Sequence, residues 1–216
     1  MFFCDFDGTI TAEETFVGMV ERVVPDLAAQ ILPDLFARRL SLRQGVRQLL
    51  EAMPAAAFTR ILDYADQQPV RPGLAALMAW VEAQGMPFVV VSGGVQAMVE
   101  QVLAREGLRQ RVAAIAAVQV QPKGDFMEVI SPWEGGTELV EKAAVMAQYP
   151  QRPWIMAGDS VTDINMAIQA DVVFARDRLQ GYLDQIGKPY IPWETFFDIR
   201  DYLRQSPIRP MSHTNG

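Results

Sequence analysis

The sequence predicts an α/β fold, with a doubly wound, Rossmann-like parallel sheet as its core and a helical cap inserted into it. Short apolar runs rich in β-branched residues alternate with helical patterns, and each run ends in small or acidic residues. Such alternation is typical of buried parallel strands flanked by helices. A long helical stretch near the N-terminus interrupts this alternation, which indicates an insertion.

Four apolar runs predict the strands of the sheet, at residues 1–4, 88–91, 154–157 and 172–175. Helical patterns separate or follow the later runs, at residues 73–84, 95–105, 138–148 and 163–169. Two further runs, 113–120 and 125–130, fit either two strands of the sheet or a small hairpin that turns at 122–124. The sequence leaves these two alternatives open.

The stretch between the first two strands is almost wholly helical in pattern, with prolines punctuating segments at 14–24, 27–39, 42–53 and 56–66. A crossover between parallel strands needs one helix, and this stretch is too long for one. We therefore predict a core formed by residues 1–11 and 72–205, a helical cap at 12–71, and a frayed tail at 206–216.

Composition excludes several classes of protein. The 216 residues are 50% hydrophobic and 21% charged, and the net charge of −7 with no basic stripe argues against nucleic acid as a partner. No uninterrupted apolar stretch reaches about 18 residues, so no membrane partner is expected. The single cysteine, Cys4, is expected to be buried in the first strand and fits a reducing, cytoplasmic location. The only histidine, His213, lies in the tail, which argues against histidine acid-base catalysis.

The first strand runs directly into Asp5-Phe6-Asp7-Gly8-Thr9. Residues two apart on a strand point the same way, so Asp5 and Asp7 are expected on one side at the carboxyl edge of the sheet, where open α/β folds bind ligands. One carboxylate there can attack an electrophile while the other moves a proton, and a divalent cation offsets the crowded charge. The alternative is an ordinary Asp/Gly turn.

Two further strand ends carry similar signals. Ser92-Gly93-Gly94 follows the second core strand, where backbone N–H groups and the serine hydroxyl can hold a phosphate, although a simple strand-to-helix turn has the same pattern. Asp159 and Asp163 follow another strand and add oxygen ligands for a hard cation, unless Ser160 or Thr162 merely caps a helix.

Lys142 begins a helical pattern before that strand. A lysine on a helix is normally solvated at the surface. It acquires a role here only if the loop before it reaches the carboxyl edge, where its ammonium group can bind phosphate as a point charge.

Taken together and in this order, the four motifs resemble those of the haloacid dehalogenase superfamily of phosphotransferases, and the resemblance extends over residues 1–205. It implies a Mg²⁺-dependent phosphatase of a small phosphorylated metabolite. Asp5 is then the nucleophile that forms an aspartyl-phosphate, and Asp7 protonates the leaving alcohol and later activates water. The resemblance assigns phosphate binding to Thr9, Ser92, Gly93 and Lys142, and metal binding to Asp5, the Asp7 carbonyl, Asp159 and the supporting Asp163.

Two subgroups of the family compete. Ser92-Gly93-Gly94 and the acidic pair Glu13-Glu14 are similar to phosphoserine phosphatases. The stretches at 158–163, 174–177 and 42–46 look more like phosphatases of the methionine-salvage intermediate 2-hydroxy-3-keto-5-methylthiopentenyl-1-phosphate, which we favour. In the cap, the predicted substrate contacts are Glu14, Arg43 and Arg47, although a solvated helix face explains each of them equally well.

Two alternatives to a phosphatase remain open. A catalytically silent relative would bind a phosphorylated ligand or a protein partner, but it would have little need of the proton-handling Asp7. Transfer of the phosphoryl group to an alcohol other than water would use the same residues as hydrolysis. The sequence does not indicate an oligomeric state.

Overall fold

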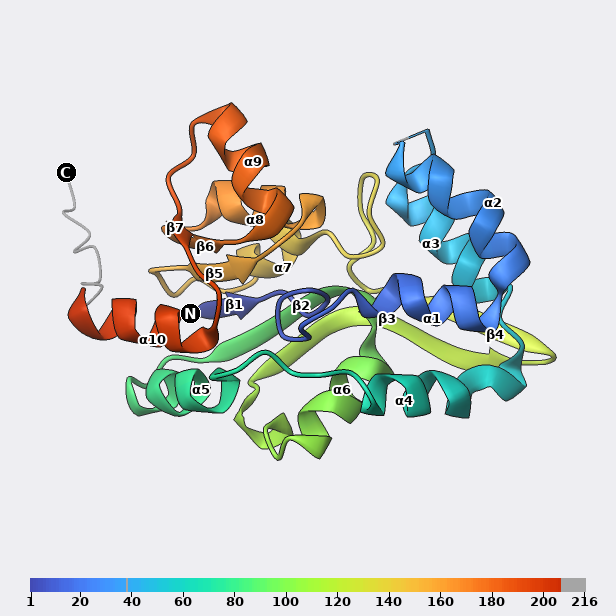
Figure 1. The fold of residues 1–216 in the computed structure, drawn as a ribbon, viewed down its shortest axis with the longest axis horizontal. Helices are drawn as coiled ribbons and strands as arrows, with labels where there is room; N and C mark the ends of the chain where they lie inside the picture. The colour runs from blue at the N-terminus through green and yellow to red at the C-terminus, as the bar shows by residue number, and fades with distance from the viewer. Residues whose placement is uncertain (38, 207–216) are drawn as a thin grey trace.

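The computed structural model describes residues 1–37 and 39–206. Within these residues the core is one seven-stranded sheet in the order β4-β3-β2-β1-β5-β6-β7, parallel except between β3 and β4 (Figure 1). The strands are β1 (Phe2–Cys4), β2 (Phe88–Val95), β3 (Ala114–Lys123), β4 (Phe126–Ile130), β5 (Ile155–Gly158), β6 (Val172–Ala175) and β7 (Ile191–Pro192). The strand order runs from the central β1 through β2 and β3 to β4 on one side, and through β5 and β6 to β7 on the other. This order confirms the doubly wound α/β class.

Strand β1 is the centre of the sheet. Phe2 pairs in register with Phe88 of β2 on one side and with Ile155 of β5 on the other. The three residues of β1 are fully buried, so the expectation of a buried Cys4 is confirmed. A strand buried on both faces must be apolar, which explains why β1 could be predicted from so short a run.

Helices cover the sheet on both sides. In Figure 1, α5 (Leu74–Ala83) and α6 (Gln96–Arg105) lie below it, and α7 (Lys142–Ala147), α8 (Ile164–Gln169) and α9 (Asp177–Ile186) lie above it. The last helix, α10 (Phe196–Gln205), packs against α5. The sequence did not lead us to predict α9 or α10. Helix α7 is also shorter than the predicted 138–148, because the preceding residues form a loop that ends at Lys142.

The ambiguous runs after residue 113 combine both alternatives. The first part of β3 pairs in parallel with β2 as a strand of the sheet, and its second part pairs with β4 as an antiparallel hairpin. The predicted turn at 122–124 lies one or two residues too early, since Lys123 pairs with Phe126. The hairpin extends beyond the sheet toward the helices that follow β1.

Those helices are α1 (Thr15–Val23), α2 (Pro25–Phe36), α3 (Leu42–Glu51), the short 3₁₀ helix η1 (Ala55–Ala57) and α4 (Phe58–Asp66). They occupy the right-hand side of Figure 1. The chain enters and leaves them side by side, because Thr11 bridges Val70 and Ala12 N donates to Pro69 O at 2.8 Å. Adjacent ends are what an inserted segment needs.

These helices also contact the core beyond their two connections. Helix α4 packs against α6, and α3 packs against β4. Ala55 N donates to Asp125 O at 2.8 Å, and Met127 N donates to Met53 O at 3.0 Å. The division into a core and a separate cap at 12–71 therefore stays a prediction.

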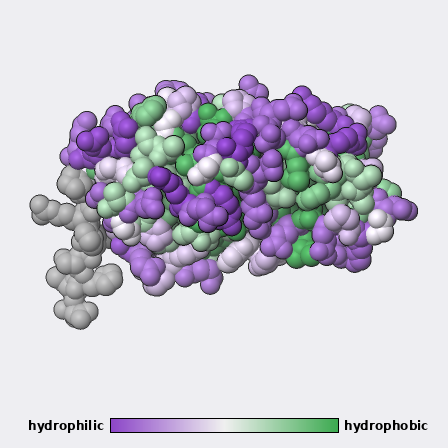
Figure 2. Space-filling view, turned by 90° about the horizontal axis from the view of Figure 1, so that it is seen from below, coloured by the Kyte–Doolittle hydropathy of each residue, from purple (hydrophilic) through white to green (hydrophobic). Residues whose placement is uncertain are grey.

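In the part of the chain that the structure describes, no helix is long and apolar enough to cross a membrane. On the face in Figure 2, hydrophilic side chains predominate, with hydrophobic ones in patches between them. The predicted tail at 206–216, with His213, lies outside the described residues except for Ser206, which caps α10.

Candidate active site

The predicted residues converge at the carboxyl edge of the sheet, on either side of the switch point at β1. Asp5 directly follows β1, and its N–H donates to Ala157 O of β5 at 3.0 Å. Asp159 directly follows β5, and Ser92 lies in the last part of β2. All three side chains are buried.

Lys142 connects the acidic residues. Its Nζ lies 2.5 Å from Asp5 Oδ1 and 2.6 Å from Asp163 Oδ1, and all three side chains are almost fully buried. Burial alone would lower the pKa of Lys142, but the charges of Asp163 and Asp5 outweigh it and raise that pKa above its ordinary value. The ammonium group therefore stays charged inside the protein. The loop before α7 does reach the carboxyl edge, as the functional interpretation of Lys142 required.

Asp5, Asp159 and Asp163 form a cluster in which one oxygen from each lies within 4.8 Å of the others. Burial, together with the charge of Asp163, raises the pKa of Asp5 well above its usual range. The same two effects raise the pKa of Asp159 to about 7. Three buried carboxyl groups thus share one lysine, and the uncompensated negative charge together with an all-oxygen donor set fits a hard divalent cation such as Mg²⁺.

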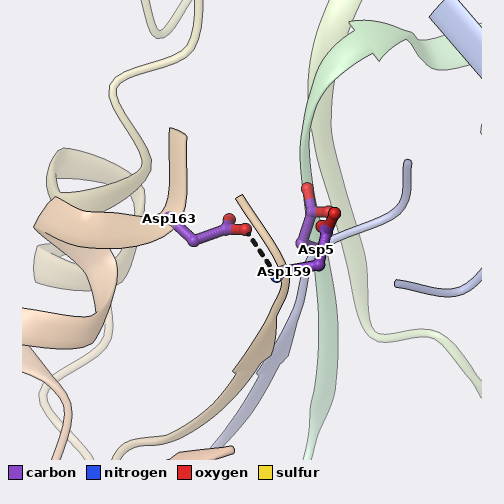
Figure 3. Close-up of side chains that lie close together, drawn as sticks. All are labelled: Asp5, Asp159 and Asp163. Atoms are coloured by element: carbon purple, nitrogen blue, oxygen red, sulfur yellow. Dashed lines mark hydrogen bonds between the residues drawn. The ribbon is translucent and has the colours of Figure 1, made fainter. Parts of the chain in front are cut away.

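The three carboxyl groups have different roles in the cluster. Figure 3 shows those of Asp5 and Asp159 side by side, whereas that of Asp163 faces the backbone of Asp159. Asp163 Oδ2 accepts from the N–H groups of Asp159 at 3.0 Å and Ser160 at 3.1 Å, and its Oδ1 binds Lys142. Both Asp163 oxygens therefore have protein donors, which fits a residue that orients the others.

Thr9 and Gly8 complete this side of the site. Thr9 Oγ1 donates to Asp159 Oδ1 at 3.0 Å, so the hydroxyl fixes a carboxylate of the cluster. Gly8 has a φ of +76°, and a Cβ there would lie 2.5 Å from Asp159 Oδ2. Only glycine fits both the left-handed backbone and this close approach. The predicted phosphate-binding role of Thr9 stays a prediction.

Asp7 points away from the cluster, toward the start of α1. Its Oδ1 accepts from Thr15 N at 3.0 Å and also from Thr15 Oγ1. Burial raises the pKa of Asp7, and the two Thr15 hydrogen bonds partly offset that effect. A carboxyl group in this state can hold a proton and release it.

The Ser92-Gly93-Gly94 segment lies at the end of β2 rather than in the turn that the sequence predicts, and α6 begins only at Gln96. The pairing of β2 with β3 shifts between Val91 and Val95, which marks an irregular strand. Ser92 Oγ accepts from Gly94 N at 3.0 Å. A Cβ at Gly93 would have no neighbour within 4 Å, so the backbone there borders open space, and the predicted phosphate-binding roles of Ser92 and Gly93 stay predictions.

Comparisons with known proteins agree with this geometry. A family model described as haloacid dehalogenase-like hydrolase matches residues 2–167. The chain belongs to the haloacid dehalogenase-like hydrolases.

A relative from Microcystis aeruginosa (strain NIES-843 / IAM M-2473), named 2-hydroxy-3-keto-5-methylthiopentenyl-1-phosphate phosphatase, is 55% identical over 201 residues, 93% of this chain and 96% of the relative. A Geobacillus kaustophilus (strain HTA426) protein of the same name is 29% identical over 214 residues, 95% and 96% of the two chains. A solved structure titled as a phospho-aspartyl intermediate analogue of phosphoserine phosphatase matches with a TM-score of 0.68 at 19% identity, covering 93% of this chain and 97% of that one. The predictions of family, fold and phosphatase class are confirmed.

The cap residues of this haloacid dehalogenase-like hydrolase lie in two places. Glu14 lines a cavity of about 420 Å³ that reaches Gly8 and Asp159. Glu14 is exposed at its mouth, yet desolvation by the surrounding walls and the charge of Asp7 raise its pKa to about 7.

Arg43 and Arg47 instead contact the loop that leads to Lys142. Arg47 Nη2 lies 2.6 Å from Glu134 Oε2, and Arg43 Nε lies 3.6 Å from Glu134 Oε1. Arg43 N also donates to Thr137 O at 2.7 Å. Their predicted role in substrate binding stays a prediction.

Sequence reasoning missed two supporting residues of this hydrolase. Arg71 is buried, and it donates to the carbonyl groups of Thr9, Gly8 and Ala12, at 3.1, 2.7 and 3.2 Å. Thr15 orients Asp7 as described above. An isolated arginine or threonine carries no motif, so neither residue gave a signal that sequence reasoning could use.

Proposed function

We propose that this protein is a Mg²⁺-dependent phosphatase that hydrolyses 2-hydroxy-3-keto-5-methylthiopentenyl-1-phosphate through an aspartyl-phosphate. The contrast between Asp5 and Asp7 carries the proposal. Asp5 lies in the carboxylate cluster and is paired with Lys142, whereas Asp7 is held apart by Thr15 and has a raised pKa. This contrast supports Asp5 as the attacking acid and Asp7 as the acid that transfers the proton.

In the first step, a carboxylate oxygen of Asp5 attacks phosphorus, and the bond from phosphorus to the ester oxygen breaks. Asp7 gives its proton to that oxygen, so the product leaves as a neutral alcohol while the phosphoryl group stays on Asp5. Lys142 balances the negative charge around Asp5, and the open backbone at Gly93 with the Ser92 hydroxyl binds phosphoryl oxygens.

In the second step, the Asp7 carboxylate takes a proton from water as that water attacks phosphorus. The bond between phosphorus and Asp5 breaks, and inorganic phosphate leaves. A Mg²⁺ ion would be held by Asp5, Asp159 and the Asp7 carbonyl, and it would supply positive charge that offsets the negative charge of the phosphoryl group.

The proposed substrate rests on the relatives that carry this name, above all the 55% identical protein that aligns with nearly the whole chain. The phosphoserine phosphatase structures are 15–19% identical and support only the fold. We also propose that residues 12–71 act as the cap, since Glu14 and Thr15 of this segment reach the site.

The test measures phosphate release by the purified protein with the proposed substrate and with phosphoserine, in Mg²⁺ and in EDTA. We expect a markedly higher kcat/KM for the proposed substrate, and activity only with Mg²⁺. Asp5→Asn should abolish turnover with the fold intact, whereas exposed Asp63→Asn should not. A higher kcat/KM for phosphoserine would mean that phosphoserine is the better substrate. An active Asp5→Asn variant would show that Asp5 is not the nucleophile.

A further inference from the structure

The mouth of the catalytic cavity has a strongly uneven charge. Its walls include Glu13 and Glu14 from the segment after β1, and Asp159 and Asp177 from the core. Arg178 is the only basic residue among the described residues that line it. A phosphorylated metabolite that enters the site through this cavity therefore passes one guanidinium group among four carboxyl groups.

The N–H groups of the Arg178 guanidinium have no acceptor among the described residues. The guanidinium group forms no hydrogen bond or ion pair with any other described residue, and its charge acts on the nearby Glu14, whose pKa it lowers. The adjacent arginine differs, since Arg176 pairs with Asp177 and Glu194 and lies over the Trp193 ring. Arg176 is thus used to hold the structure, whereas the planar five-donor fork of Arg178 is available for a ligand.

The backbone around Arg178 is fixed beside the carboxylate cluster of Asp5, Asp159 and Asp163. The next residue, Leu179, donates its N–H to Asp159 O at 2.8 Å, which joins the first turn of α9 to the cluster. The preceding residue, Asp177, has a φ of +46°, the only positive φ of a non-glycine residue in the described chain. Such backbone strain persists only where surrounding contacts impose it, and it concentrates at ligand sites.

We propose that Arg178 is a specificity-determining residue that binds oxygen atoms on the carbon skeleton of the substrate, next to the phosphorylated carbon. This inference rests on the proposed phosphatase function, which puts the phosphoryl group against the Asp5 carboxyl group that pairs with Lys142. The remainder of the substrate then extends into the cavity that Arg178 lines. The preferred substrate class is a phosphomonoester with carbonyl or hydroxyl groups on the two carbons beyond the ester carbon.

Two probes with the same phosphoryl group separate this role from simple attraction of anions. Fructose 1-phosphate has oxygen atoms on the first two carbons beyond its ester carbon, and p-nitrophenyl phosphate has none at the corresponding positions. For Arg178→Gln, we expect kcat/KM to fall about 10- to 100-fold for fructose 1-phosphate, since hydrogen bonds from a charged group are lost. The fall should be at least tenfold larger than that for p-nitrophenyl phosphate.

Two further variants control for charge and for general effects. Arg178→Lys keeps the charge without the fork and should recover less than half of the lost selectivity on a logarithmic scale. Arg204→Gln removes an exposed arginine of α10, far along the chain from the cavity-lining residues, and should behave like the wild type. An equal loss with both probes, or no loss with either, would overturn the inference.

Binding to protein that cannot turn over provides a readout that does not depend on phosphatase activity. Calorimetry on Asp5→Asn should show a preference for fructose 1-phosphate over inorganic phosphate, and adding Arg178→Gln should reduce that preference about tenfold or more. If the wild type releases phosphate neither from these probes nor from the proposed substrate, the proposed function fails, while this preference still decides the role of Arg178. An unchanged preference would reject that role.

Discussion

Gly94 and Asp7 approach so closely that a Cβ on Gly94 would lie 2.6 Å from Asp7 Oδ2. The other side of the same Asp7 carboxyl group accepts hydrogen bonds from Thr15. The carboxyl group is therefore held between the end of β2 and the start of α1. The orientation of the proposed acid-base residue depends on both elements, which are almost 80 residues apart in the sequence.

Gly94→Ala should disable catalysis without unfolding the protein. The φ of Gly94 is not positive, so alanine fits the backbone, but its methyl group must displace the Asp7 carboxyl group. A displacement of about 1 Å in a reacting group costs roughly 100-fold in rate. We expect kcat to fall by about that factor, with a loss of about 1–2 kcal/mol in unfolding free energy.

Gly181→Ala is the matched control, because a Cβ there has no neighbour within 4 Å and lies on the exposed side of α9. It should leave kcat unchanged and stabilise the helix by up to about 1 kcal/mol. Steady-state kinetics and urea unfolding measure both variants. A fully active Gly94→Ala variant would show that the position of Asp7 does not limit the reaction.

Arg71→Ala should destabilise the loop that carries the first motif. The buried guanidinium group donates to three backbone carbonyl groups of that loop, and its loss leaves these acceptors without partners. We expect a loss of about 3 kcal/mol in unfolding free energy. Arg71→Lys should recover only part of it, because an ammonium group lacks the fork that reaches separate carbonyl groups.

Arg204→Ala removes an exposed arginine and is the control for the Arg71 variants. Its unfolding free energy should stay within about 0.5 kcal/mol of the wild type. If Arg71→Ala unfolded at the same urea concentration as this control, the loop would be held by other contacts.

The way Arg71 acts explains which parts of the site the sequence could predict. Strands β1, β2, β5 and β6 are buried and largely apolar, so the sequence shows where each of them ends. A site residue near such an end can therefore be located from the sequence alone. The sequence therefore predicted Asp5, Ser92 and Asp159 at one edge. Arg71 acts through a pairing between residues on either side of a long insertion, and a local pattern cannot show such a pairing.

Helix α9 was missed for a different reason. Helix α9 begins at a non-glycine residue with a positive φ, and its N-terminus is fixed by Asp159 rather than by a side-chain cap of its own. The hairpin of β3 and β4 was ambiguous because a single strand, β3, pairs with two partners in opposite directions. In both cases tertiary contacts decide the element.

Mg²⁺ should stabilise the folded protein, since the buried carboxylates of the cluster repel one another without a cation. At about 100 times the dissociation constant, a ligand that binds only the folded state adds about 2.7 kcal/mol. For a chain of this size we expect Tm to rise by about 5–10 °C in calorimetry.

Asp159→Asn should remove most of that rise in Tm, whereas exposed Asp63→Asn should retain it. The comparison is made at constant ionic strength, so that general screening by salt is the same in every sample. Equal Tm values for the wild type in Mg²⁺ and in EDTA would contradict the metal assignment.

Asp198 should make the stability of α10 depend on acid. Its Oδ2 accepts from Thr195 N at 2.8 Å and Glu194 N at 3.1 Å, and the bonds from Thr195, then Glu194, lower the pKa of Asp198 below its usual 3.8. A lowered pKa in the folded state means that the unfolded chain binds the proton more readily. The contribution is therefore complete above pH 3.8 and declines as the pH falls through the lowered value.

Because the Asp198 side chain is exposed, we expect the capping contribution to be about 1 kcal/mol. Urea unfolding should show Asp198→Ala to be less stable than Asp201→Ala, a control in the same helix, near pH 7, with the gap closing at the acid end. A gap that stayed constant down to pH 2 would assign the effect to helix propensity and not to the charged cap.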